Sequence, residues 1–304
     1  MTQLLNALPG ALAQGLIWGV MAIGVYITYK VLDIADLTVD GSICTGAAVC
    51  TMLLLGGQSP WLALLCAVLA GVLAGAVTGL LHVGLGIPPI LAGILTQMVL
   101  WSVNLKLLGK ANQALPARTT PVLLSQMDVG GALPVLLGFC VVLVALLVLF
   151  FGTELGCALR ATGCNPVMSR AQGVNTGLMK IIGLALSNGV VALSGALLCQ
   201  YQGYTDVNMG RGAVVIGLAA GVIGQAVLGR RGGRMAVQLG GVILGAVIYY
   251  IVYQVIIFAG FDTDLLKMFS AVVVAVFLGA PHVKAQLKAH SRSKKGDSGH
   301  AENE

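Results

Sequence analysis

A polar stretch from residue 152 to residue 178 lies between two long apolar runs and could dock onto a partner protein. Near its centre is Gly163-Cys164-Asn165-Pro166. This tetrapeptide is typical of a turn, because Asn can cap a helix and Pro suits the first helical position. A short helix here could press on another protein. An ordinary loop is the alternative, and the residues alone favour neither.

A second polar group follows a pair of prolines, Pro88 and Pro89. These prolines would interrupt a helix and leave backbone groups free, which lipid tolerates only inside protein or beside a cavity. Gln97 and Asn104 come next and are seven residues apart, so they share one helix face. They are candidates for a solute pathway. Hydrogen bonding between buried helices is an equally good interpretation.

Three acids, Asp33, Asp36 and Asp40, have the spacing that would align them on one helix face. A cation site is conceivable, but a turn in solvent or at the headgroup level is the favoured interpretation. The remaining acids also lie at the ends of apolar runs. The sequence therefore predicts no acid at the centre of the membrane, and we expect the driving force to come from another subunit.

The known catalytic motifs are missing from this chain. It has no Gly-x-x-x-x-Gly-Lys-[Ser/Thr], His-Glu-x-x-His or Gly-x-Ser-x-Gly sequence, and its four histidines are scattered. We therefore expect no catalytic residue, no metal site and no nucleotide bound by this chain. It is not expected to be an enzyme.

Composition indicates that lipid, rather than water, surrounds most of this chain. Hydrophobic residues make up 58% of the 304 residues and charged residues 9%, whereas a soluble domain carries about 25% charged residues. The apolar runs are continuous, so they indicate membrane helices rather than strands of a barrel. The 42 glycines suit close helix packing in lipid. No basic patch alternates with aromatics, so nucleic acid is not an expected partner.

We predict an all-α, polytopic transmembrane helix bundle with about nine membrane segments within residues 1–284. Residues 285–304 are polar and are expected to form a disordered tail. The predicted segments are Leu12–Tyr29, Ile43–Leu55, Trp61–Leu81, Ile90–Leu108, Leu133–Phe151, Met179–Cys199, Gly212–Leu228, Met235–Phe258 and Leu265–Leu278. The second is short and could be a broken or re-entrant piece.

The orientation follows from the basic residues. If the 152–178 stretch faces the cytoplasm, alternation of the segments places 12 of the 17 lysines and arginines inside. Cytoplasmic loops are enriched in these residues. The sequence therefore predicts an external N-terminus and a cytoplasmic C-terminus in a bacterial plasma membrane.

Several motifs together resemble the branched-chain amino acid and ribose permease family of ABC importers. The 152–178 stretch is similar to that family's cytoplasmic coupling segment. It departs at Cys157, where the family often has Arg, and at Met168 and Ser169. The matching residues are Gly156, Ala158, Leu159, Arg160, Ala161, Gly163, Asn165 and Gly173. Further similar stretches are Gly86–Ala92, Leu193–Leu197, Gly210–Gly212 and Ile216–Gly224.

The resemblance implies an ABC importer permease fold and a set of partners. These are an ATPase subunit that binds ATP and Mg, an extracytoplasmic solute-binding protein, and a second permease copy, most simply as a homodimer. No cofactor is expected in this chain. The residues expected to couple it to the ATPase are Arg160, Ala161, Gly163, Asn165, Pro166, Arg170 and Gly173. We call residues 152–178 the coupling segment.

The implied function is ATP-driven import of a small solute. The lack of predicted charge within the membrane suits a neutral or zwitterionic solute, with amino acids slightly favoured. A stand-alone secondary transporter or channel is the alternative, and it would need no ATP. The expected pathway residues are Pro88, Pro89, Gln97 and Asn104.

Replacing Gly163 and Asn165 by Leu is expected to uncouple transport while membrane insertion stays intact, because both residues form the turn of the coupling segment. Solute uptake into vesicles is the measurement. Unchanged uptake would argue against a coupling role for this segment.

Overall fold

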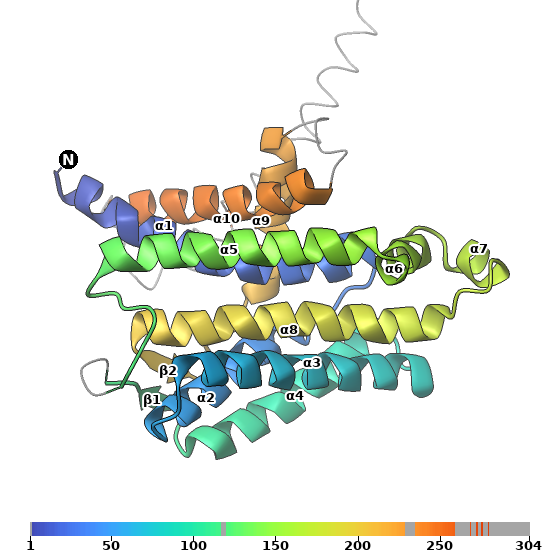
Figure 1. The fold of residues 1–304 in the computed structure, drawn as a ribbon, viewed down its shortest axis with the longest axis horizontal. Helices are drawn as coiled ribbons and strands as arrows, with labels where there is room; N and C mark the ends of the chain where they lie inside the picture. Colours follow the sequence, from blue (N-terminus) through green and yellow to red (C-terminus); the bar gives the residue numbers. More distant parts are fainter. Residues whose placement is uncertain are drawn as a thin grey trace, which may run out of the picture. The chain divides into compact units, whose positions relative to one another are not determined.

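The structure, a computed structural model, describes residues 2–116, 120–228 and 235–258, together with positions 268, 272, 275 and 279 (Figure 1). The described helices are α1 (Thr2–Tyr26), the π-helix η1 (Ile27–Val31), α2 (Val39–Leu55), α3 (Pro60–Gly84), α4 (Pro89–Leu108), α5 (Val129–Gly152), α6 (Glu154–Cys164), α7 (Pro166–Ala171), α8 (Thr176–Gln202), α9 (Ala213–Leu228) and α10 (Met235–Phe258). Two short strands, β1 (Asn112–Ala114) and β2 (Tyr204–Asp206), complete this set.

The expected all-α, polytopic bundle is confirmed. Within the described residues, six helices are long and apolar enough to cross a membrane, and α2 and α9 are shorter apolar helices. The eight predicted segments up to Phe258 each correspond to one of these helices. The ninth prediction, Leu265–Leu278, and the predicted tail at 285–304 lie outside the described residues.

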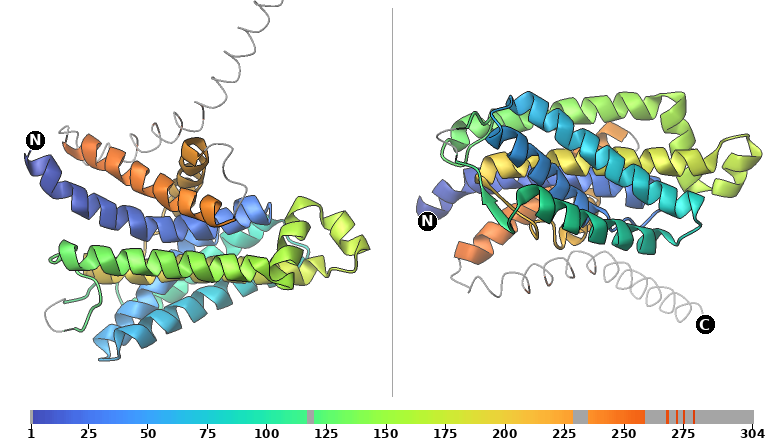
Figure 2. Two further views of the ribbon diagram at one scale, coloured as in Figure 1. Left: turned by 45° about the horizontal axis from the view of Figure 1, so that its top comes forward. Right: turned by 90° about the horizontal axis from the view of Figure 1, so that it is seen from below.

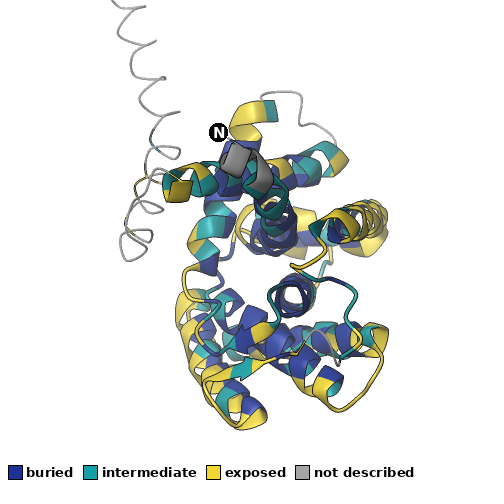
Figure 3. Cartoon of the chain, turned by 90° about the vertical axis from the view of Figure 1, so that its left-hand side faces the viewer, coloured by how far each residue is buried: buried dark blue, intermediate teal, exposed yellow. Residues whose placement is uncertain are grey.

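Helix α8 is the centre of the packing. It contacts α1, α2 and α3, and the helices turn buried residues toward one another and exposed residues outward (Figure 3). Two α8 hydroxyls fasten it to α1: Ser187 donates to the Gly24 carbonyl at 2.8 Å, and Ser194 to the Ile17 carbonyl at 2.7 Å. Hydroxyl bonds of this kind hold helices together where water cannot compete.

Helices α3 and α8 pack backbone to backbone along a glycine stripe. Gly71, Gly75 and Gly79 recur every four residues on α3, and a Cβ at any of them would collide with α8. At Gly75 the collision would be with the Leu184 carbonyl, which cannot move aside. Small residues at this spacing let membrane helices approach closely, so the stripe is a packing face, as its spacing predicts.

The chain is non-helical between the first and second membrane segments, over residues 32–38, and we call this stretch the break. Helix α1 continues into the wider turns of η1, residues 32–38 then lead back into the bundle, and α2 starts beside the middle of α8, where Ser42 bonds to Asn188. Helix α2 occupies only the half of the bundle nearest β1 and β2 (Figure 1). The short second segment is therefore a half-helix.

Asp36 lies in this break and is 5% exposed. Its carboxylate accepts from the Thr38 backbone N–H at 2.8 Å and from Asn188 Nδ2 at 2.7 Å. The same Asn188 amide donates to the Leu184 carbonyl at 2.9 Å, and its oxygen accepts from Ser42 at 2.6 Å. We call Asp36, Ser42 and Asn188 the break cluster.

The predicted solvated turn is therefore wrong for Asp36. Asp33 is exposed, as a solvated turn would require, but Asp36 points into the bundle and Asp40 is only partly exposed. The buried break contains polar backbone groups that lipid would leave unsatisfied, and an acidic side chain supplies the acceptors. Sequence spacing could not show this, because the Asn188 partner is 152 residues away.

A chain of threonine hydroxyls continues from the break to α3 and α4. Thr38 and Thr78 Oγ1 atoms are 2.8 Å apart, and Thr78 donates to Thr96 at 3.0 Å. Gly93 on α4 allows this approach, because a Cβ there would press on the Leu37 backbone nitrogen at 2.8 Å. The break is thus held from three helices at once.

The long connection between α4 and α5 forms an ordered cap where it is described. Strand β1 pairs antiparallel with β2, with Gln113 opposite Thr205. The Gln200 side chain accepts from the Leu123 backbone N–H at 3.0 Å, and Asp128 caps α5 through Gly131. The cap and the coupling segment lie at opposite ends of the bundle (Figure 2).

The glycine stripe makes a stability prediction. Gly75→Ala should lower the free energy of unfolding by about 1–3 kcal/mol. The new methyl group would overlap the Leu184 carbonyl, and backbone cannot move aside as a flexible side chain can. Gly138→Ala is the matched control, since that helical glycine has nothing within 4 Å of a built Cβ. Thermal unfolding in detergent is the measurement. Equal melting temperatures for the two variants would contradict a close backbone contact.

The break cluster makes a second prediction. Asp36→Asn should destabilise the protein by about 1–3 kcal/mol, because the new amide would face the Asn188 amide, which is already fixed by Leu184. Asp33→Asn is the control: Asp33 is exposed at φ 56°, a conformation that Asn also tolerates. Size-exclusion chromatography after a heat challenge measures how much of each variant stays folded. If only the Asp33→Asn variant lost folded protein, the break cluster would not contribute to stability.

Candidate functional site

A polar cavity of about 480 Å³ lies between α2, α4 and the connection that follows β2. Its wall combines charged, amide, hydroxyl, aromatic and sulfur-bearing side chains. The lining residues are Asp40, Gly41, Cys44, Gln97, Met98, Trp101, Ser102, Asn104, Val207 and Arg211. This mixture of a few polar groups on an apolar background is typical of small-molecule sites.

Asp40 ties the cavity to the start of α9. Its carboxylate accepts from the backbone N–H groups of Gly212 at 3.0 Å and Val214 at 3.2 Å. A carboxylate at a helix N-terminus satisfies orphan donors and complements the helix dipole. Gly210 packs directly on the Asp40 carbonyl, where a Cβ would collide. The N-terminal turns of two short helices therefore meet at this cavity.

Asn104 is the residue of the cavity wall whose buried polar side-chain atoms lack a partner within the described residues. It is fully buried, and neither its Nδ2 nor its Oδ1 has a hydrogen-bond partner within the described residues. A buried amide without partners costs about 1–3 kcal/mol or more, so its presence calls for an explanation. Ser102, by contrast, donates to the Met98 carbonyl at 3.4 Å.

The structure divides the four residues expected along a solute pathway into two pairs. Gln97 and Asn104 line the polar cavity together. Pro88 and Pro89 begin α4 as its N-cap and first residue and are not among the lining residues. Asp40, Trp101 and Arg211 were not expected in the pathway. Asp40 had a signal as one of the three spaced acids, and Arg211 as part of the Gly-Arg-Gly motif, but their sequence separation hid that both border one cavity with Trp101.

The coupling segment folds into two short helices. Thr153 caps α6 through Gly156, and Asn165 caps α7 by accepting from the Val167 and Met168 backbone N–H groups at 3.1 and 3.0 Å. The predicted turn at 163–166, with Asn165 as the cap and Pro166 in the first helical position, is confirmed.

Within the described chain, the two arginines of this segment already have intramolecular partners. Arg160 donates to the Phe151 carbonyl at 3.1 Å, and Arg170 donates to the Thr176 hydroxyl at 3.1 Å. Both remain exposed, as do Ala161, Asn165, Pro166 and Gly173. Gly173 has φ 84°, which only glycine adopts readily, so it ends the α7 turn.

Gly163 faces the bundle rather than the exterior. A Cβ on Gly163 would collide with the Val31 carbonyl at the end of η1. Nearby, Leu32 and the fully buried Leu159 both lie against Gly183 of α8. The coupling segment is therefore packed directly on the chain that leads to Asp36.

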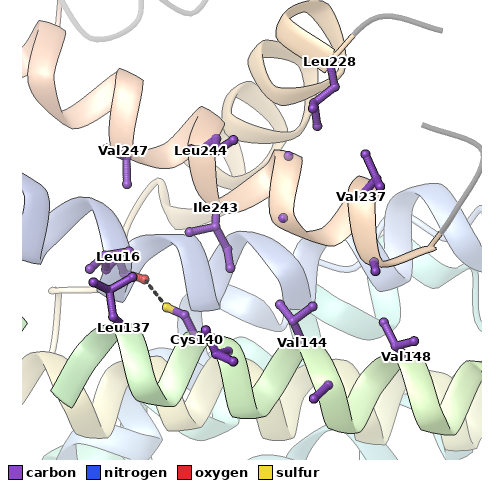
Figure 4. A pocket seen from close by; sticks show the side chains of 15 residues that line it. Leu16, Leu137, Cys140, Val144, Val148, Leu228, Val237, Ile243, Leu244 and Val247 are labelled. Atoms are coloured by element: carbon purple, nitrogen blue, oxygen red, sulfur yellow. Dashed lines mark hydrogen bonds between the residues drawn. The ribbon is translucent and has the colours of Figure 1, made fainter. Parts of the chain in front are cut away.

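A larger cavity, of about 680 Å³, is almost entirely apolar. It lies between α1, α5, α9 and α10, with Leu16, Cys140 and Ile243 pointing into it (Figure 4). Cys140 donates to the Leu16 carbonyl at 3.8 Å. The groove has no group that could orient a polar solute, so it suits lipid chains or another apolar helix. Among the described residues, no three potential ligands lie together as a metal site would require.

The comparisons with known proteins agree on one family. The family model "Branched-chain amino acid transport system / permease component" matches residues 8–280. A tyrosine transport system permease protein of Clostridioides difficile is 38% identical over 287 residues, covering 93% of this chain and 94% of its own. An uncharacterized protein of Rickettsia prowazekii is 33% identical, covering 91% and 98%.

A more distant relative is the autoinducer 2 import system permease protein LsrC of Escherichia coli. It is 29% identical over 216 residues, covering 67% of this chain and 60% of its own length. No solved structure matches the fold.

Permeases of this family lack ATPase activity and carry no cofactor, so ATP hydrolysis belongs to a partner subunit. An extracytoplasmic binding protein is the other partner that such an importer implies. With its multi-pass helical fold and a family match that extends over nearly its full length, the chain belongs to the branched-chain amino acid permease family of ABC importers.

Proposed function

We propose that this permease imports an amino acid, and that its coupling segment receives the force of the ATPase on the cytoplasmic side. The observation that carries the amino acid assignment is the 38% identity, over 93% of the chain, to the permease of a tyrosine transport system.

The orientation is part of this proposal. With α6 and α7 in the cytoplasm, Lys30, Arg160, Arg170 and Lys180 all gather at the inner surface, which the positive-inside rule favours. The described helices then place α1's first residues and the β1–β2 cap outside, where a binding protein would deliver solute. This supports an external N-terminus. The cytoplasmic C-terminus stays a prediction, because the ninth segment and the tail lie outside the described residues.

Exposed apolar side chains on α7 support a docking role. Val167 is 77% exposed and Met168 is 60% exposed, and they lie one and two residues after the Pro166 that opens the helix. A polar segment at the end of the bundle has no lipid to cover such side chains. We infer that they enter a groove of the ATPase, with Arg160, Ala161, Asn165, Arg170 and Gly173 around them.

The force would then pass to the break that follows the first membrane segment. Gly163 and Leu159 press on Val31 and Leu32, and residues 32–38 lead directly to Asp36 and the start of α2. Asp40, one turn into α2, borders the polar cavity. A small shift at the coupling segment can therefore change the cavity by moving a half-helix, as in other alternating-access transporters.

Gln97 and Asn104 are proposed to line the solute pathway, since they border the polar cavity. Pro88 and Pro89 are proposed to act indirectly, by fixing where α4 starts. The second permease copy, as a homodimer, remains part of the proposal. Its expected role is to complete the transporter, because one chain of this family supplies half of the membrane part.

A stand-alone transporter would be favoured by a buried acid that is free to take up protons or cations. Asp36 is buried, but both of its oxygens accept hydrogen bonds from its own chain. It therefore acts as a structural acceptor, and the ATP-driven function is the one we propose.

Reconstitution tests the proposed function directly. Proteoliposomes holding the permease and its ATPase, with binding protein outside and ATP inside, should accumulate radiolabelled L-tyrosine. An ATPase variant that cannot hydrolyse ATP should abolish the uptake. Equal uptake without ATP would support the stand-alone alternative.

The docking surface gives a mutational prediction. Met168→Asp, alone or with Val167→Asp, should lower co-purification of the ATPase about tenfold or more, because a buried charge without a partner is costly at an interface. Met127→Asp is the control, since Met127 is 82% exposed at the opposite end of the bundle. Pull-down from detergent measures the effect. If Met127→Asp weakens binding and Met168→Asp does not, α7 is not the docking site.

A further inference from the structure

We infer that the polar cavity between α2, α4 and residues 207–212 holds the transported solute as a zwitterionic amino acid. Asp40 would bind its ammonium group, Arg211 its carboxylate, and Asn104 a polar group at the end of its side chain. This inference rests on the proposed function, because it names the site and the recognition chemistry for the amino acid proposed there.

The two charges of the cavity are complementary to those of a free amino acid. The Asp40 carboxylate accepts two hydrogen bonds, from the backbone N–H groups of Gly212 and Val214. A carboxylate can accept about four. The Arg211 guanidinium, with five donors, has no side-chain hydrogen bond within the described residues. The two groups both line the cavity and form no ion pair with each other there. Each is therefore left with capacity for a charged partner.

Asn104 is the independent observation that points to a ligand. Both of its amide atoms are unsatisfied although the side chain is fully buried in the described chain. A sugar could hydrogen-bond to Asp40 and Arg211 but has no charge to pair with either, whereas an amino acid with a polar tip would pair with both charges and also reach Asn104. Trp101, on the same helix, adds an aromatic face beside them.

The place of the cavity in the fold agrees with this use. The N-terminal turns of α2 and α9 meet at Asp40, and broken helices commonly form solute sites in membrane transporters. The volume, about 480 Å³, accommodates an amino acid with an aromatic side chain. The site also lies one helical turn from the break cluster, so movement there would reshape it.

Competition binding tests the assignment of the two charges. The permease–ATPase complex in nanodiscs, without binding protein, is titrated with radiolabelled L-tyrosine against tyramine and 3-(4-hydroxyphenyl)propionate. These analogues lack the carboxylate and the ammonium group, respectively. Each should compete about ten- to a hundredfold more weakly than L-tyrosine, since each loses a charge-assisted hydrogen bond.

The variants then connect each analogue to one residue. In Arg211→Gln, L-tyrosine should bind as weakly as tyramine does, and the affinity for tyramine should stay unchanged. In Asp40→Asn, L-tyrosine should bind as weakly as 3-(4-hydroxyphenyl)propionate does, and the affinity for that analogue should stay unchanged. Lys106→Gln, which removes an exposed cation of α4 outside the cavity wall, is the control and should bind normally. L-tyrosine binding that is absent, or that is unchanged in Arg211→Gln, overturns the inference.

Asn104→Leu separates a ligand role from a packing role. Removing an unsatisfied amide should raise the melting temperature of the empty protein. It should also erase an expected preference of about tenfold or more for L-tyrosine over L-phenylalanine. A purely structural residue would change the melting temperature without changing that preference, and this result would exclude Asn104 from recognition.

Uptake distinguishes failure of this inference from failure of the proposed function. If the complete importer accumulates L-tyrosine with ATP and Arg211→Gln leaves its KM unchanged, the cavity assignment is wrong while the proposed function stands. If the unmodified importer shows no ATP-dependent amino acid uptake, the proposed function itself is wrong.

Discussion

The structure depends on satisfying polar backbone groups inside the bundle at residues 32–38, between the first membrane segment and the half-helix α2. Lipid offers no hydrogen bonds, so a chain that stops being helical there must find partners within the protein. Asp36 accepts from the Thr38 backbone N–H, Asn188 and Ser42 continue the network from Asp36, and the Thr38–Thr78–Thr96 hydroxyls extend it to neighbouring helices. These bonds hold the start of α2 beside the middle of α8.

Close packing around α8 makes the network possible. The glycines of α3 bring its backbone against that of α8, and Gly46 and Gly195 do the same between α2 and α8. Short hydrogen bonds between distant segments require such approach, because a single intervening methyl group would separate the partners. Glycine, which weakens a helix in water, is therefore the residue that lets this bundle hold its polar centre.

The proposed coupling and solute sites meet at the same half-helix. The coupling segment packs on Val31 and Leu32 at one side of the break, and Asp40 borders the polar cavity on the other. An element that is short, polar at its start and held by a few bonds is suited to having two positions. This arrangement gives a physical route by which an ATPase could act on a solute it never touches.

Asp36 is an acid buried inside the bundle, where the sequence predicted none. An absence of buried acids was expected to show that energy comes from another subunit, and Asp36 removes that premise. The family assignment provides the conclusion instead. Both Asp36 oxygens accept hydrogen bonds from their own chain, one from the Thr38 backbone and one from the Asn188 side chain, which is a structural use of a buried acid.

By itself, the amino-acid sequence determined the solvent, the helical class, the positions of most helices and the family. Continuous apolar runs decide these features locally, and Met235–Phe258 matches its predicted bounds. The cap formed by Asn165 was equally readable, because donor and acceptor are neighbours in the chain. The glycine spacing of α3 likewise indicated a packing face, although not its partner.

Only the tertiary structure decided where Asp36 lies and which residues surround the polar cavity. Asp36 meets Asn188 across 152 residues, and Asp40 meets Gly212 across 172. Such pairs depend on how helices stack, which apolar periodicity does not specify. Gln97 and Asn104 could be proposed from a shared helix face, but the charges opposite them come from other segments. A site built at a helix break is therefore visible only once the break itself is placed.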